Sequence, residues 1–105
     1  MTTYQVDPWT ALGDPSRKRI FEHVAARPRS VAELADRLPI SRPAVSQHLK
    51  VLRDAGLVGV RVEGTRRIHH VDPAGLRRLR EELDSFWGQA LATFQQIAEQ
   101  EDHHP

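Results

Sequence analysis

The sequence predicts a mainly α-helical domain with one small β-hairpin. Four segments within residues 7–56 each start with a capping residue and continue with apolar residues at helical spacing. Residues 57–71 alternate apolar and polar side chains around a glycine, which is typical of a hairpin. From residue 73 to about residue 100 a single amphipathic pattern predicts one long helix.

Length and composition indicate one soluble globular domain. The chain has 105 residues, of which 39% are hydrophobic and 28% charged. No apolar run approaches the roughly 20 residues that span a bilayer, and the N-terminus lacks the pattern of a signal peptide. The absence of cysteine excludes disulfides and thiolate metal sites. We expect a single cytoplasmic domain over residues 1–105, with flexible tails at 1–6 and 101–105.

Local capping signals define the first three helices. Asp7 precedes a helix over residues 8–13, and Asp14 precedes a second helix that ends before Pro28. Ser30 and Glu33 have the spacing of a capping box at the start of a third helix. Two residues, 39 and 40, then separate this helix from the next, so the link is very short.

The fourth helix begins after Ser41 and ends near Gly56. Val45, Leu49 and Leu52 recur at helical spacing and should face the core. The predicted order of elements is that of a winged helix-turn-helix: three helices, a short turn, a fourth helix, a hairpin and a last helix. In that fold the second helix of the turn enters the major groove of DNA with its N-terminal residues on the base edges.

Two groups of residues are therefore predicted to contact double-stranded DNA. On the fourth helix, removing the core positions leaves a polar face whose arginine and glutamine suit guanine and adenine. Its members are Ser41, Arg42, Pro43, Ser46, Gln47 and Lys50. The hairpin tip, or wing, adds Gly64, Thr65, Arg66 and Arg67. Alternation places the two arginines on opposite faces, so one can contact DNA while the other protects the strand edge.

Charge is distributed in agreement with a polyanionic partner for the middle of the chain. Residues 41–70 contain six lysines and arginines against two acids, a net charge of +4. Residues 81–105 contain six acids and neither lysine nor arginine. Ordinary charge scatter on solvated faces explains the same counts, so the distribution alone does not decide between the two interpretations.

The last helix is too long for its domain to cover. Its 28 predicted residues span about 42 Å, whereas a compact chain of this length has a radius of gyration of about 13 Å. Its apolar stripe should therefore pair with a second copy of the chain. The stripe comprises Leu83, Phe86, Ala90, Phe94 and Ile97.

The segment SRPAVSQHLKVLRDAGLVGVRVEGTRRIHHVDPAGL, residues 41–76, resembles the ArsR family of bacterial winged helix-turn-helix repressors. Residues 9–24, WTALGDPSRKRIFEHV, resemble the helices that precede it in that family. The resemblance implies that the fourth helix reads the major groove and that the terminal helices form a symmetric dimer. It adds Trp9, Leu12 and Trp87 to the expected dimer interface.

No metal, cofactor or catalytic site is expected. The third helix lacks the cysteines of the family's thiolate sensors, and residues 86–99 of the last helix lack histidine and aspartate. The remaining histidines converge poorly: His69 and His70 point to opposite faces of a strand, and His103 and His104 lie in the tail. The chain thus resembles a metal-free branch of the family with an aromatic last helix. It has no phosphate loop and no nucleophile with a matching base.

The sequence therefore predicts a homodimeric DNA-binding repressor with an inverted-repeat operator, and not an enzyme. Two alternatives stay open. One is a winged-helix protein-interaction module that binds no DNA and uses Phe86 and Trp87 for a protein partner. The other is a ligand- or metal-gated sensor of the same fold, because a pocket at a dimer interface is not visible in a sequence.

Overall fold

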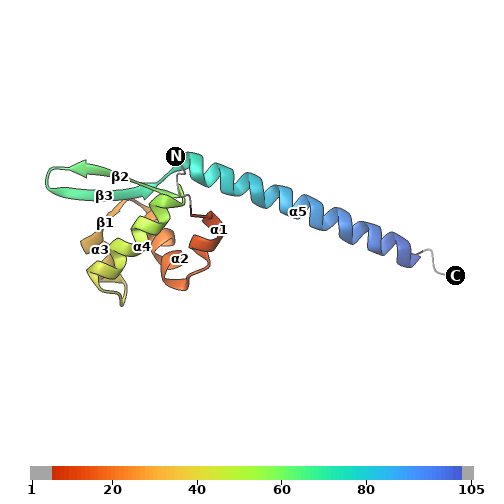
Figure 1. Ribbon diagram of the computed structural model, residues 1–105, viewed down its shortest axis with the longest axis horizontal. Helices are drawn as coiled ribbons and strands as arrows, with labels where there is room; N and C mark the ends of the chain where they lie inside the picture. Colours follow the sequence, from red (N-terminus) through yellow and green to blue (C-terminus); the bar gives the residue numbers. More distant parts are fainter. Residues whose placement is uncertain (1–5, 103–105) are drawn as a thin grey trace.

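The computed structural model describes residues 6–102 and contains five helices and a three-stranded sheet in that range. In chain order these are α1 (Pro8–Leu12), α2 (Pro15–Ala26), β1 (Arg29–Ser30), α3 (Val31–Arg37), α4 (Arg42–Asp54), β2 (Val58–Glu63), β3 (Arg66–Val71) and α5 (Pro73–Asp102). Residues 8–71 form a head that includes the projecting β2–β3 wing, and α5 extends from it in another direction (Figure 1). The predicted mainly helical winged fold is confirmed.

The four predicted helix caps are present. The side chains of Asp7, Asp14 and Ser41 each accept a hydrogen bond from the backbone N–H three residues later. Ser30 and Glu33 form the full capping box, in which each side chain accepts from the other residue's backbone N–H. These bonds satisfy N–H groups that have no partner within the helix, so each helix starts where its cap stands.

The core lies among α2, α3, α4 and the base of the wing. The three α4 positions expected to be buried, Val45, Leu49 and Leu52, are completely inaccessible to solvent. They join Ile20 of α2 and Leu34 of α3 in one cluster. Burying Leu49 and its neighbours turns the opposite, polar face of α4 outward.

The sheet has one strand more than the predicted hairpin. β1 pairs antiparallel with β3, placing Arg29 opposite His69 and Ser30 opposite Ile68, and the strand order is β1–β3–β2. A strand of two residues leaves no alternating pattern, which is why the sequence does not predict it. The turn between β2 and β3 contains Gly64 at φ +63°, the left-handed region that glycine adopts without strain.

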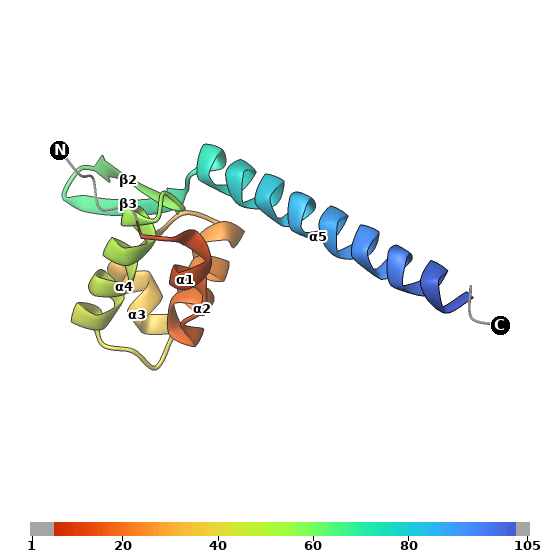
Figure 2. The same ribbon diagram turned by 45° about the vertical axis from the view of Figure 1, so that its right-hand side comes forward.

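Helix α5 leaves the head as one continuous rod. It runs through Gly88 without a break, and its far end lies well away from the head in both views (Figures 1 and 2). The longest dimension of the molecule is 71 Å and its radius of gyration is 18.7 Å, against about 13 Å for a compact chain of this length. The start of α5 packs tightly, since a Cβ on Gly75 would collide with the carbonyl oxygen of Gly56.

The ends of the chain differ from the expected tails at three residues. Val6 packs against the core, and residues 101 and 102 continue α5. The other residues of both expected tails, His103 and His104 among them, lie outside the described range.

Candidate DNA interface

The first turns of α4 present the predicted polar face to solvent. All six residues expected to contact DNA on this helix are exposed: Ser41, Arg42, Pro43, Ser46, Gln47 and Lys50. The hydroxyl of Ser41 already accepts a hydrogen bond of 3.3 Å from the backbone N–H of Ala44. It still has a proton to donate outward. An exposed helix start with arginine, glutamine and lysine is suited to DNA, because it offers donors for both base edges and phosphates.

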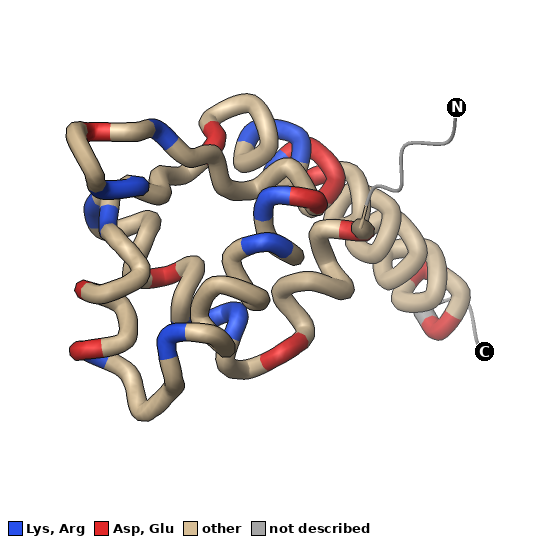
Figure 3. Tube along the Cα trace, turned by 60° about the vertical axis from the view of Figure 1, so that its left-hand side comes forward, with Lys and Arg blue, Asp and Glu red and all other residues tan. Residues whose placement is uncertain are grey.

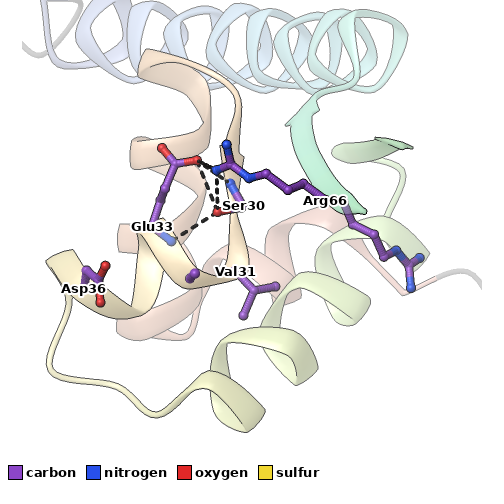
Figure 4. A pocket seen from close by; sticks show the side chains of 7 residues that line it. Ser30, Val31, Glu33, Asp36 and Arg66 are labelled. Atoms are coloured by element: carbon purple, nitrogen blue, oxygen red, sulfur yellow. Dashed lines mark hydrogen bonds and ion pairs between the residues drawn. The ribbon is translucent and has the colours of Figure 1, made fainter. Parts of the chain in front are cut away.

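Arg66 of the wing is held by the head. Its Nη2 donates to Oε1 of Glu33 at 2.7 Å and to Oγ of Ser30 at 3.3 Å (Figure 4). Hydrogen bonds from the backbone and side chain of Ser30, followed by the charge of Arg66, lower the pKa of Glu33. This network joins the start of β3 to the start of α3, so Arg66 anchors the wing. That one wing arginine contacts DNA while the other protects the strand edge stays a prediction.

Arg67 lines two hollows. It shares one of about 360 Å³ with Arg66, Glu33 and Asp36, and it also lines a hollow of about 150 Å³ between α4, the start of α3 and the wing. The other lining residues are Val31, Ser46, Arg53 and His69. The hollow thus brings together one predicted residue of the recognition helix, Ser46, and one of the wing, Arg67.

Arg53 and His69 are functional candidates that the sequence reasoning missed. His69 is 3% exposed, and its Nε2 lies 3.1 Å from Nη1 of Arg53. Arginine only donates, so Nε2 accepts and the ring is neutral with its proton on Nδ1. Burial, then the charges of Arg53 and Arg67, lower the pKa of His69 to about 4. The sequence could have indicated Arg53 by its spacing, because Arg53 follows Ser46 by seven residues and therefore lies on the same side of α4.

Basic residues are spread over the head and the start of α5, and six of the fifteen lie on α4 and the wing (Figure 3). Acids are present as well: Glu63 near the wing tip pairs with Arg61 at 2.8 Å, and Glu33 pairs with Arg66. Within the described range, Arg53 and Arg67 form no ion pair with a carboxylate. Their charges are therefore available to an anion from outside the chain.

The predicted dimer stripe of α5 is largely exposed on the single chain. Phe94 is 70% exposed, Phe86 61%, Trp87 54% and Ile97 51%. Leu83 is 40% exposed. At helical spacing these residues share one face with Ala90 and with Leu91, which is 62% exposed and was missed although it lies one turn after Trp87.

Helix α1 continues this apolar surface. Trp9 is 41% exposed, and its Nε1 donates to Oε2 of Glu82 at 2.8 Å. Trp9, Glu82, Leu83 and Phe86 line a groove of about 320 Å³ between α1 and α5. Leu12, also predicted for the interface, packs in part against the core of its own head.

Over residues 6–102, no group of three or more His, Asp or Glu residues is placed to hold a metal ion. No helix in that range is long and apolar enough to cross a membrane.

Known proteins share this fold and sequence. A helix-turn-helix domain family matches residues 12–61. The HTH-type transcriptional regulator Rv2034 of Mycobacterium tuberculosis is 50% identical over 103 residues, which is 96% of each chain. An ArsR-like transcriptional regulator from Rhodococcus is 33% identical, with a TM-score of 0.67 over 86% of this chain and 88% of that one. The homodimeric winged helix-turn-helix DNA-binding domain of Mb0332 from Mycobacterium bovis is 26% identical, with a TM-score of 0.63 over 77% of this chain and 75% of that one.

This chain belongs to the ArsR family of winged helix-turn-helix transcriptional repressors. Double-stranded DNA is therefore its partner, and the prediction that it is a regulator and not an enzyme is confirmed. Membership also disfavours the alternative of an interaction module without DNA binding. The α4 face and the wing of this ArsR-family protein form the candidate interface.

Proposed function

We propose that this ArsR-family protein represses transcription as a homodimer bound to an inverted-repeat operator. The observation that carries the proposal is the exposed polar face of α4, which stands opposite a fully buried apolar face of the same helix. The two α4 helices of a dimer would enter successive major grooves about 34–36 Å apart. A regulator of this kind acts where the chromosome lies, in agreement with the expected cytoplasmic location.

Each exposed residue of α4 has a role that its chemistry suits. Gln47, one turn into the helix, would pair with adenine through its amide, and Arg42 would pair with guanine. Lys50 and the hydroxyls of Ser41 and Ser46 would contact phosphates or base edges. In the wing, Arg67 is the arginine free to reach DNA, and residues 64 and 65 shape the turn beside it.

The dimer would form through α1 and α5. The apolar stripe of α5, from Leu83 to Ile97, covers about four turns of helix and is largely exposed. A two-fold pairing would bury the stripe of each subunit against that of the other. The homodimeric state of the Mb0332 domain, which has the same fold, supports this arrangement.

Selection of bound fragments from random duplex DNA tests the proposal directly. We expect an inverted repeat to be enriched. Gln47→Ala should then cost about 1–3 kcal/mol per half-site and relax the preference at one base position. Gln96→Ala serves as the control, because it removes the same side chain from an exposed position on α5 outside the apolar stripe.

Two results would contradict the proposal. If the selection enriched no sequence and the protein bound all duplexes with equal affinity, it would not recognise a specific operator. If Gln47→Ala selected the same DNA sequence as the wild type, Gln47 would not read a base.

A further inference from the structure

The hollow beside α4 contains positive charge without a counter-ion. Of the arginines around the wing, Arg61 and Arg66 are paired with carboxylates. Arg53 and Arg67 both line the hollow, and neither forms an ion pair within residues 6–102. No acidic residue is among those that line it. Two like charges placed together without an acid favour the binding of an anion.

Arg53 is held in place by a buried neighbour. Nε2 of His69 accepts from Nη1 of Arg53 at 3.1 Å, and the His69 ring is 3% exposed. The Nδ1 atom of the same ring is buried and has no hydrogen-bond partner. A neutral histidine that accepts from a guanidinium fixes it without neutralising it, so the full charge of Arg53 stays available.

The size and position of the hollow define the anion. Its volume is about 150 Å³, and it is open to solvent. A phosphate group with some of its water fits this space, whereas a base pair does not. Ser46 of α4 and Arg67 of β3 both line it, so an anion bound there would contact the recognition helix and the wing together.

We propose that this hollow binds one phosphodiester group of the DNA backbone in each half-site. Arg53, Arg67 and the hydroxyl of Ser46 would donate to its oxygens, and His69 would act as a positioning residue for Arg53. The phosphate would fix the angle at which α4 lies in the groove. This inference rests on the proposed DNA-binding function and adds the contact that sets the register.

The first experiment uses the full chain and the selected operator with single methylphosphonate linkages, each of which removes the charge of one phosphate. Wild-type protein should lose about tenfold in affinity at one linkage per half-site. Arg53→Gln should lose about tenfold on the unmodified duplex and lose nothing further at that linkage. The matched control is Arg61→Gln, which removes an equal charge from an exposed wing residue already paired with Glu63. It should show the full wild-type loss at the linkage.

The second experiment separates the role of His69 from general packing. His69→Gln retains a side-chain acceptor for Arg53, whereas His69→Leu removes it. We expect His69→Leu to lose the linkage-specific effect and His69→Gln to retain most of it. Equal behaviour of the two variants, with unchanged circular dichroism, would overturn the positioning role.

Three results distinguish the explanations. If Arg53→Gln lost affinity at every methylphosphonate linkage by the same factor as the wild type, no linkage would depend on Arg53. That result would overturn the phosphate site while leaving DNA binding intact. Binding of inorganic phosphate that depends on Arg53, together with wild-type operator affinity of Arg53→Gln, would assign the hollow to free anions and overturn the DNA contact. Failure of the wild type to bind duplex DNA would overturn the proposed function itself and this inference with it.

Discussion

The head and α5 contain the same kinds of apolar residues but place them in opposite environments. Within the head, Val45, Leu49 and Leu52 are fully buried. Along α5, Phe86 is 61% exposed and Phe94 70%. The two regions follow the same helical rule, with apolar residues every three to four positions. They differ in their surroundings: the apolar face of α4 packs in the core of the head, whereas that of α5 is exposed to solvent.

This difference shows where the molecule is self-sufficient. The head folds around its own core, so its stability should not depend on a second copy. An exposed apolar stripe as long as that of α5 is larger than soluble monomers usually present. We therefore expect the head to read DNA and α5 to be completed by association, and four predictions test that separation.

The largest effect is expected for Phe94→Glu. It places a carboxylate in the α5 stripe of each subunit, where dimerisation would desolvate the charge against apolar neighbours. We expect the dimer to weaken at least about 100-fold and operator affinity to fall with it, although no DNA-reading residue has changed. Sedimentation equilibrium and a DNA titration on the same sample measure both quantities.

The control for Phe94→Glu is Val62→Glu, because Val62 is also 70% exposed but lies in the wing. It should leave the dimer intact. A stable dimer of the Phe94 variant, or a monomer with full operator affinity, would show that α5 does not have this role.

Paired truncations of leucine sharpen the comparison. Leu49→Ala opens a cavity in the head and should cost about 3 kcal/mol of unfolding free energy at any protein concentration. Leu91→Ala, on the α5 stripe, should cost less than about 0.5 kcal/mol in dilute solution and more where the dimer is populated. Urea unfolding at two protein concentrations measures this, and a concentration-independent effect of Leu91→Ala would contradict the assignment.

A third prediction uses pH to test the head alone. The pKa of His69 is lowered from 6.5 to about 4 by burial and then by Arg53 and Arg67. The unfolded chain therefore takes up a proton at a higher pH than the folded chain, and protonation favours unfolding. Stability should be full above pH 6.5 and decline below it by about 1.4 kcal/mol per pH unit. The loss should level off near pH 4, at a total of about 3 kcal/mol.

His69→Gln removes the titrating group and should flatten this decline. The pKa values of Asp14 and Glu33 are lowered by hydrogen bonds to their carboxylates, so their contributions are present above their ordinary values of 3.8 and 4.5 and are lost as the pH falls through them. The range from pH 6.5 to 4.5 therefore isolates His69. Identical slopes for the wild type and His69→Gln in that range would contradict the prediction.

The smallest effect separates the two wing arginines. Arg67→Ala should reduce the salt dependence of DNA binding by about one unit per half-site, because it removes a phosphate contact. Arg66→Ala should leave the salt slope unchanged and cost up to about 1 kcal/mol of head stability through the lost pair with Glu33. DNA titrations at several salt concentrations decide this, and equal slopes for both variants would mean that the arginines are not divided in this way.

The sequence by itself determined the elements whose signals are local. A cap such as Asp14 or Ser41 bonds to a backbone N–H three residues away, so a stretch of four residues contains the whole interaction. Gly56 and Gly64 occupy the two left-handed positions of the described chain, as their places after a helix and inside a turn predict. The polar face of α4 follows from the helical repeat alone, once the core positions are subtracted.

Only the tertiary structure decided what distant segments do to one another. Strand β1 exists because β3 lies beside it, and two residues leave no pattern of their own. Arg66 and Arg67 are neighbours in sequence, yet one meets Glu33 across 33 positions and the other meets the hollow with Arg53 and His69. Such contacts depend on how the helices pack, and the energy of a buried group depends on all its neighbours in space. Periodicity along the chain does not contain that information.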